Sequence, residues 1–113
     1  MMKDELFEDL VIRVESQFRD EAPLIIPSEE KTAMLKGQCE AFARRFPDDV
    51  PGHYRPQEPE EADLETRTRF WLKNFAVLVS HCLAHDRLRE KITARPELGA
   101  LAEFVAMSKQ RCN

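Results

Sequence analysis

The sequence predicts an all-α fold, a four-helix bundle-like single domain organised around a long central third helix. Apolar residues recur at spacings of three and four in four separate segments, and no segment shows the alternation of a strand. Only three glycines and one tyrosine occur in 113 residues, which argues against a turn-rich β fold. A chain of this length can bury one core. The predicted helices cover residues 3–20, 28–46, 63–94 and 96–109.

The first two predicted helices are amphipathic and have clear boundaries. Ser28 is a good N-cap for the second helix, and Pro47 ends it. Between the two helices, prolines bracket the apolar residues 24–26, which we expect to form an extended connector pressed on the core. The apolar faces are Phe7, Leu10, Val11, Val14 and Phe18 in the first helix and Leu35, Cys39, Phe42 and Phe46 in the second.

The third predicted helix, residues 63–94, contains the most apolar stretch of the chain. Trp71, Phe75, Leu78 and Cys82 follow one another at spacings of four, three and four, which is the period of a core-facing helix. Further apolar residues flank this face on both sides, so other helices or a second copy of the chain must cover it. The apolar run is too short and too closely flanked by charge to span a membrane.

An acidic, proline-rich connector, residues 47–62, precedes this helix. It holds four of the seven prolines of the chain. Connections of this length without secondary structure are uncommon in compact domains, and are usually functional or disordered. Two interpretations stay open: a solvated linker, or a recognition loop. In the second, His53, Tyr54 and Arg55 contact a partner, because Tyr and Arg often anchor interfaces.

A line of polar residues lies on the edge of the apolar face of the third helix. Arg67, Asn74 and His81 recur every seven residues, and His85 follows four residues later. They are either satisfied locally between two packed helices, or they contact a partner and set its register. A homodimer sharing the third helix is one such arrangement. Acidification would then loosen it by placing charged histidines near arginine.

Catalytic and metal chemistry have weak support. His81, Cys82 and His85 could contribute zinc ligands from one helix, but no Cys-x-x-Cys motif occurs and the fourth ligand has no obvious source. We therefore expect no native metal, no cofactor and no enzymatic activity. Three cysteines without framework spacing, and an N-terminus without an apolar signal core, favour a reducing compartment, the cytoplasm.

The function that these patterns favour is binding to another protein, as adaptor, inhibitor or regulator. An alternative is a nucleic-acid-associated regulator that uses the basic end of the third helix. Asp86 and Glu90 are interleaved with these bases, which makes nucleic-acid binding the weaker interpretation. A metal-binding or catalytic helical protein is the third interpretation. The basic residues of the alternative site are Arg87, Arg89, Lys91 and Arg95.

Overall fold

A computed structural model of the chain describes every residue except 1, 22–25 and 113, and it describes the side chains of residues 7–18 and 26–109. The described backbone is helical and contains no strand, which confirms the predicted all-α class. Its five α-helices are α1 (Met2–Glu21), α2 (Glu29–Arg45), α3 (Leu64–Ala84), α4 (Asp86–Thr93) and α5 (Gly99–Cys112). Two short 3-10 turns complete the set, η2 (Pro47–Asp49) and η3 (Pro96–Leu98).

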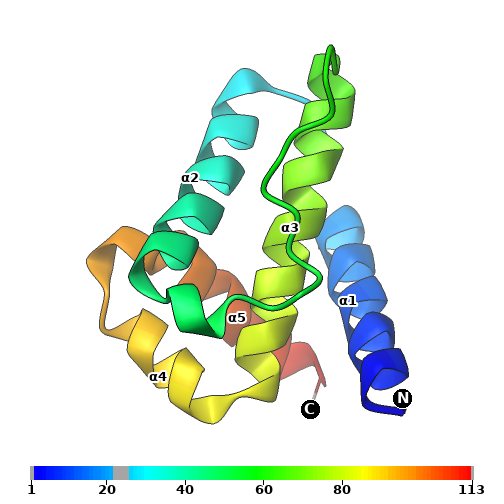
Figure 1. The fold of residues 1–113 in the computed structure, drawn as a ribbon. Helices are drawn as coiled ribbons and strands as arrows, with labels where there is room; N and C mark the ends of the chain where they lie inside the picture. Colours follow the sequence, from blue (N-terminus) through cyan, green and yellow to red (C-terminus); the bar gives the residue numbers. More distant parts are fainter. Residues whose placement is uncertain (1, 22–25, 113) are drawn as a thin grey trace.

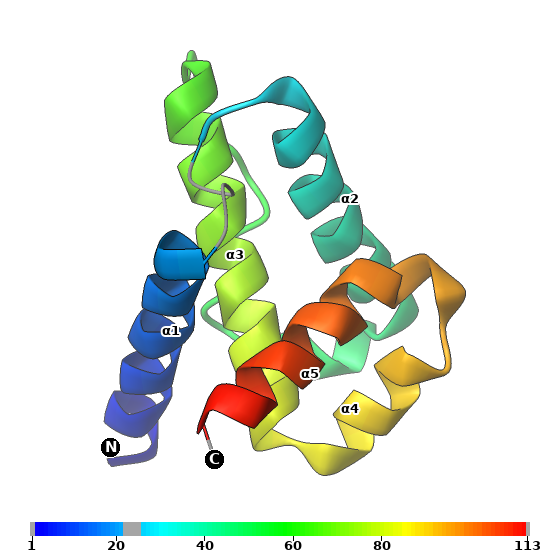
Figure 2. The same ribbon diagram turned by 180° about the vertical axis from the view of Figure 1, so that it is seen from behind.

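Helix α3 is the centre of the fold, as predicted. Helices α1 and α2 lie on its two sides, the connector runs along its front (Figure 1), and α5 crosses behind it (Figure 2). Every side chain from Asn74 to Ser80 is buried as a result. This part of the helix is therefore covered within one copy of the chain, whereas Phe70 and Leu83 are only partly buried. The homodimer stays a prediction.

The prediction of one continuous helix over 63–94 was wrong, because the helix breaks at His85. His85 has extended backbone angles, φ −133° and ψ 100°, so that α3 ends at Ala84 and α4 starts in a new direction (Figure 1). The turn lets α4 fold back under the domain, where Leu88 and Ile92 are buried. Burying two such side chains stabilises the break by about 3–6 kcal/mol relative to leaving them exposed beyond the end of the domain.

Other predicted boundaries hold closely. Ser28 accepts a hydrogen bond from the Lys31 amide at 3.0 Å and caps α2, and Asp63 accepts one from the Thr66 amide at 2.8 Å and caps α3. Within the predicted segment 24–26, residues 24 and 25 lie outside the described residues. Ile26 is 58% exposed, so the expectation that it presses on the core was wrong.

The core contains the aromatic residues that the sequence placed there. Trp71 and Phe75 are both buried on α3. Phe75 meets Phe18 of α1 and Phe104 of α5 in a triangle with ring-centroid distances of 5.9, 5.3 and 5.2 Å. The edge-to-face contacts in this triangle are geometries that aromatic pairs prefer. We call these three residues the aromatic joint, because they join α3 to two other helices.

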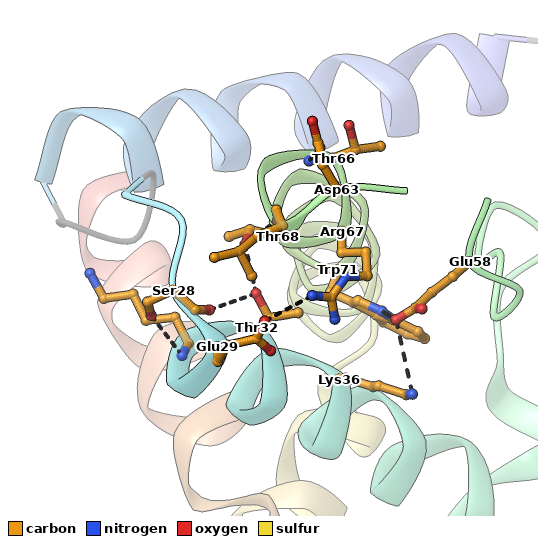
Figure 3. A network of polar contacts seen from close by, with 12 residues as sticks. Ser28, Glu29, Thr32, Lys36, Glu58, Asp63, Thr66, Arg67, Thr68 and Trp71 are labelled. Carbon is orange, nitrogen blue, oxygen red and sulfur yellow. Dashed lines mark hydrogen bonds and ion pairs between the residues drawn. The ribbon is translucent and has the colours of Figure 1, made fainter. Parts of the chain in front are cut away.

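The contact between α2 and α3 has a different chemistry. The hydroxyls of Thr32 and Thr68 lie 2.6 Å apart in the buried interface, where one donates to the other (Figure 3). Each also lies 2.8 Å from a carbonyl oxygen of its own helix segment, and the hydroxyl that accepts across the interface donates its single proton to that carbonyl. At the edge, the Arg67 guanidinium donates to a carboxylate oxygen of Glu29 at 2.9 Å. We call these four residues the polar joint.

Candidate functional site

The connector is packed against α3 and does not form the solvated linker of the first interpretation. Asn74 holds it by its backbone: the amide oxygen accepts from the Arg55 N–H at 2.9 Å, and the amide nitrogen donates to the Arg55 carbonyl at 2.8 Å. Asn74 is buried, so this pair of bonds fixes the position of residue 55 along the helix.

A second attachment lies about one helical turn away. The Trp71 indole N–H donates to a carboxylate oxygen of Glu58 at 2.6 Å, and the Lys36 ammonium lies 3.9 Å from the same oxygen (Figure 3). Four prolines further restrict the connector backbone. The connector is thus a fixed wall beside α3, with its position set by two side chains of that helix.

The three predicted contacts of the connector face different ways. Tyr54 is only 7% exposed and packs toward α2, where burial first, and then Cys39 and Glu40, raise the pKa of its phenol to about 12. Its side chain is therefore part of the core and offers little surface to a partner. His53 and Arg55, on either side of it, line a groove on the outer face.

The structure does not bring the predicted polar line together on one surface. Arg67 faces α2 and pairs with Glu29, whereas Asn74 is buried under the connector. Only His81 and His85 are neighbours, with ring centroids 4.5 Å apart at the end of α3. The line is therefore divided among three sets of contacts within the chain.

The histidine end of α3 has little capacity for metal binding. Burial, followed by the charge of His85, lowers the pKa of His81, while Asp49 acts in the opposite direction. Cys82 is fully buried, and burial raises the pKa of its thiol to about 12, so it is not a thiolate at neutral pH. Within the described residues, no three His, Cys, Asp or Glu side chains are arranged to hold a metal ion.

A groove of about 590 Å³ lies between α1, the connector and α3. Its apolar surface comes from Val11 and Ile12 of α1 and from Phe70 and Val77 of α3. Val11 and Val77 are buried, whereas Ile12 is 62% exposed at the rim. The sequence did carry one signal for this site, since Ile12 is an apolar residue outside the inward face predicted for its helix.

The elements that line this groove carry opposite charges. Glu8 and Glu15 of α1 are acidic, whereas Arg55 of the connector and Lys73 of α3 are basic, and His53 of the connector also lines the groove. Glu8 and His53 approach to 3.8 Å at one end. We call this site the charged groove. It can hold an apolar group on its floor, attract a cation along one side and attract an anion along the other.

The basic residues of the nucleic-acid alternative are partly engaged elsewhere. Arg89 pairs with Asp86 at 2.8 Å, and Lys91 lies 3.7 Å from Asp49 and over the Phe46 ring. Arg87 and Arg95 are exposed. Two of these four basic residues are thus neutralised by acidic neighbours, which does not strengthen the nucleic-acid interpretation.

A shallower depression of about 480 Å³ lies between α4 and α5.

No protein-family model, curated protein or solved structure matches this chain. Among the described residues, no helix is both long enough and apolar enough to cross a membrane. The geometry of the charged groove is therefore the basis for assigning a function.

Proposed function

We propose that the protein acts by binding a segment of another protein in the charged groove, as an adaptor, inhibitor or regulator. The observation that carries this proposal is the combination of apolar side chains with acidic residues on α1 and basic residues on the connector and α3, in a site of about 590 Å³. Ligand sites typically combine a mostly apolar surface with a few placed polar groups.

The rigidity of the groove supports the proposal. The connector wall is held by Asn74 and Trp71, and the other two walls are α-helices. A site whose walls are fixed before binding loses less conformational entropy when it binds. At the rim, the side chain of Ile12 is exposed rather than packed in the core, so it is available to contact a partner.

We propose the cytoplasm, a reducing compartment, as the place of action. Cys39 and Cys82 are both buried free thiols, and burial is the first cause that raises the pKa of each. They pack as small apolar side chains and give the fold no covalent link. A domain of this kind depends on its core alone, which suits a reducing environment.

Affinity capture with matched variants tests the function. Ile12→Gln removes an exposed apolar side chain from the groove, and Met107→Gln removes one that is 42% exposed on α5. Wild-type protein and both variants are immobilised, and extract of the native host is passed over each. The proposal requires a protein that the wild type and Met107→Gln retain and Ile12→Gln releases.

The captured protein is then purified and titrated by calorimetry against the same three proteins. Binding that Ile12→Gln weakens at least tenfold, with Met107→Gln unchanged, supports the charged groove as the site. Failure to find any protein whose binding depends on Ile12 would overturn the proposal.

A further inference from the structure

From the charged groove we infer the kind of segment that binds there: a helix of about two turns with an apolar face, an acidic flank toward Lys73 and a basic flank toward Glu8. This inference rests on the proposed function and specifies its partner. The alternatives, an extended peptide or a helix with one sign of charge, are outcomes of the test below.

Backbone chemistry selects a helix over an extended peptide. An extended segment has unpaired N–H and C=O groups, and it binds well where an open backbone edge pairs with them. No strand of the described residues offers such an edge at the charged groove. Two walls are helices, and the Arg55 N–H and C=O on the third wall are already bonded to Asn74. A helix satisfies its own backbone and needs only side-chain contacts.

The length of the groove matches about two turns of a helix. The α1 residues of the groove run from Glu8 to Glu15, and the α3 residues run from Phe70 to Val77. Each stretch advances seven residues, which is about 10 Å along a helix axis. A third helix laid between them makes contact over about two turns. Its apolar side chains would meet Val11 and Val77 on the floor and Ile12 at the rim.

Charge complementarity sets the two flanks. Glu8 and Glu15 are one heptad apart on α1, so both project along the same wall. Opposite them, Lys73 is exposed and makes no hydrogen bond or ion pair within the described part of the chain. The Arg55 guanidinium donates to the Gly52 carbonyl and supports the same wall. A partner carboxylate near Lys73 and a partner cation near Glu8 therefore complement the charges that line the groove.

Four synthetic peptides test this inference by NMR titration of the isotope-labelled full-length protein at low salt. They are stapled helices with one common apolar face of Leu and Phe. The first has one acidic and one basic flank, the second has two acidic flanks, the third has two basic flanks, and the fourth is the first with a central proline and no staple. We expect the first to bind in the groove at least tenfold more tightly than each of the others.

Charge reversal gives the second readout. Lys73→Glu should weaken binding of the mixed-flank helix at least fivefold. It should also reduce the difference in affinity between that helix and the helix with two basic flanks. Arg13→Glu reverses an exposed cation on α1 outside the groove and should change neither. The inference is overturned if no peptide shifts groove resonances at millimolar concentration, if the proline peptide binds best, or if Lys73→Glu has no effect.

The capture experiment separates this failure from that of the proposed function. A natural partner that binds through Ile12 with an extended segment, or independently of Lys73, overturns the helical inference and leaves the function standing. Absence of any partner dependent on Ile12 overturns the function itself.

Discussion

The two joints of α3 are made of different chemistry, and they differ in how they can be disrupted. The aromatic joint brings the buried rings of Phe18 and Phe75 together with the partly buried ring of Phe104. The polar joint places Thr32 and Thr68 in a buried interface where each hydroxyl has a defined partner. A substitution in the aromatic joint should destabilise the fold according to the side-chain volume that it removes. A substitution in the polar joint should destabilise it according to the hydrogen-bonding groups that it leaves without a partner.

The same contrast continues along the helix. Two more polar contacts follow the polar joint along α3. The side-chain amide of Asn74 donates to the Arg55 carbonyl, and the indole N–H of Trp71 donates to Glu58. The next residue, Phe75, belongs to the aromatic joint. Adjacent residues of α3 thus serve two different stabilising mechanisms, and substitutions one position apart can separate them.

The largest effect is expected at the aromatic joint. Phe75→Ala removes a fully buried ring and should lower the free energy of unfolding by about 3–5 kcal/mol. Chemical denaturation measures this change. Met107→Ala, at an exposed position of α5, is the control and should stay within about 0.5 kcal/mol. A loss below about 1 kcal/mol for Phe75→Ala would show that the aromatic joint is not the main apolar contact of α3.

The next effect is expected one residue away. Asn74→Ala leaves both the N–H and the C=O of Arg55 without their partner, at a cost of about 1–3 kcal/mol. Hydrogen exchange at the Arg55 amide should accelerate beyond the change in global stability, because the connector is released locally. Lys73→Ala, the exposed neighbour, should leave that amide protected. An unchanged exchange rate in Asn74→Ala would mean that the connector is held by other contacts.

Periodicity was sufficient to predict the aromatic side of α3. Trp71 and Phe75 belong to one apolar face in the sequence, and both are buried. The N-cap of α2 was equally predictable, since Ser28 acts within three residues of its own position. These features depend on local geometry, which spacing in the sequence reports directly.

Contacts between distant polar residues could not be predicted. Asn74 was visible as a polar residue in an apolar seam, but nothing in the sequence says that its partner is the backbone of Arg55. Gln38 is a similar case, because its side chain accepts from the Leu101 amide and donates to the Glu97 carbonyl. Spacing reports which face a residue occupies, and it does not report what lies opposite.

The break at His85 and the charged groove were missed for a related reason. Residues 86–93 continue the helical period, so the pattern alone extends the helix, and only the packing of Leu88 and Ile92 shows that the chain turns. The groove requires α1, the connector and α3 to be placed together. Both features depend on the relative positions of helices, which one-dimensional periodicity does not contain.

A smaller effect is expected at the polar joint, where the energetic coupling between Thr32 and Thr68 can be measured. Thr68→Val removes the bond between the two hydroxyls and leaves Thr32 with only the Ser28 carbonyl as its partner, at a cost of about 1 kcal/mol. Thr32→Val should cost a similar amount. The double variant should cost less than the sum of the two by at least 0.5 kcal/mol, because two apolar groups of similar shape replace the pair.

Denaturation of the two single variants and the double variant completes this cycle. Strictly additive losses would contradict the pairing of Thr32 with Thr68. A matching cycle on Phe18 and Phe104 sharpens the comparison, since its coupling would come from packing with no hydrogen bond involved.

The smallest expected effect is a pH dependence at the far end of α3. Burial and the nearby His85 lower the pKa of His81 below its ordinary value of 6.5. The unfolded chain then binds a proton more readily than the folded one. His81 therefore costs no stability well above pH 6.5, and stability falls as the pH drops through 6.5 toward the lowered pKa.

The substitution His85→Gln tests this assignment by removing the second cause of the shift while leaving burial in place. NMR titration of the His81 ring should give a pKa below 6.5 in the wild type and a higher value in the variant. The loss of unfolding free energy between pH 7.5 and pH 5.5 should also be smaller in the variant. Because Asp49 favours the protonated form of His81, the net effect is modest, and Asp49→Asn should enlarge it. A wild-type His81 that titrates at or above 6.5 would show that Asp49 outweighs both opposing causes, and acidification would then no longer destabilise this end of α3 through His81.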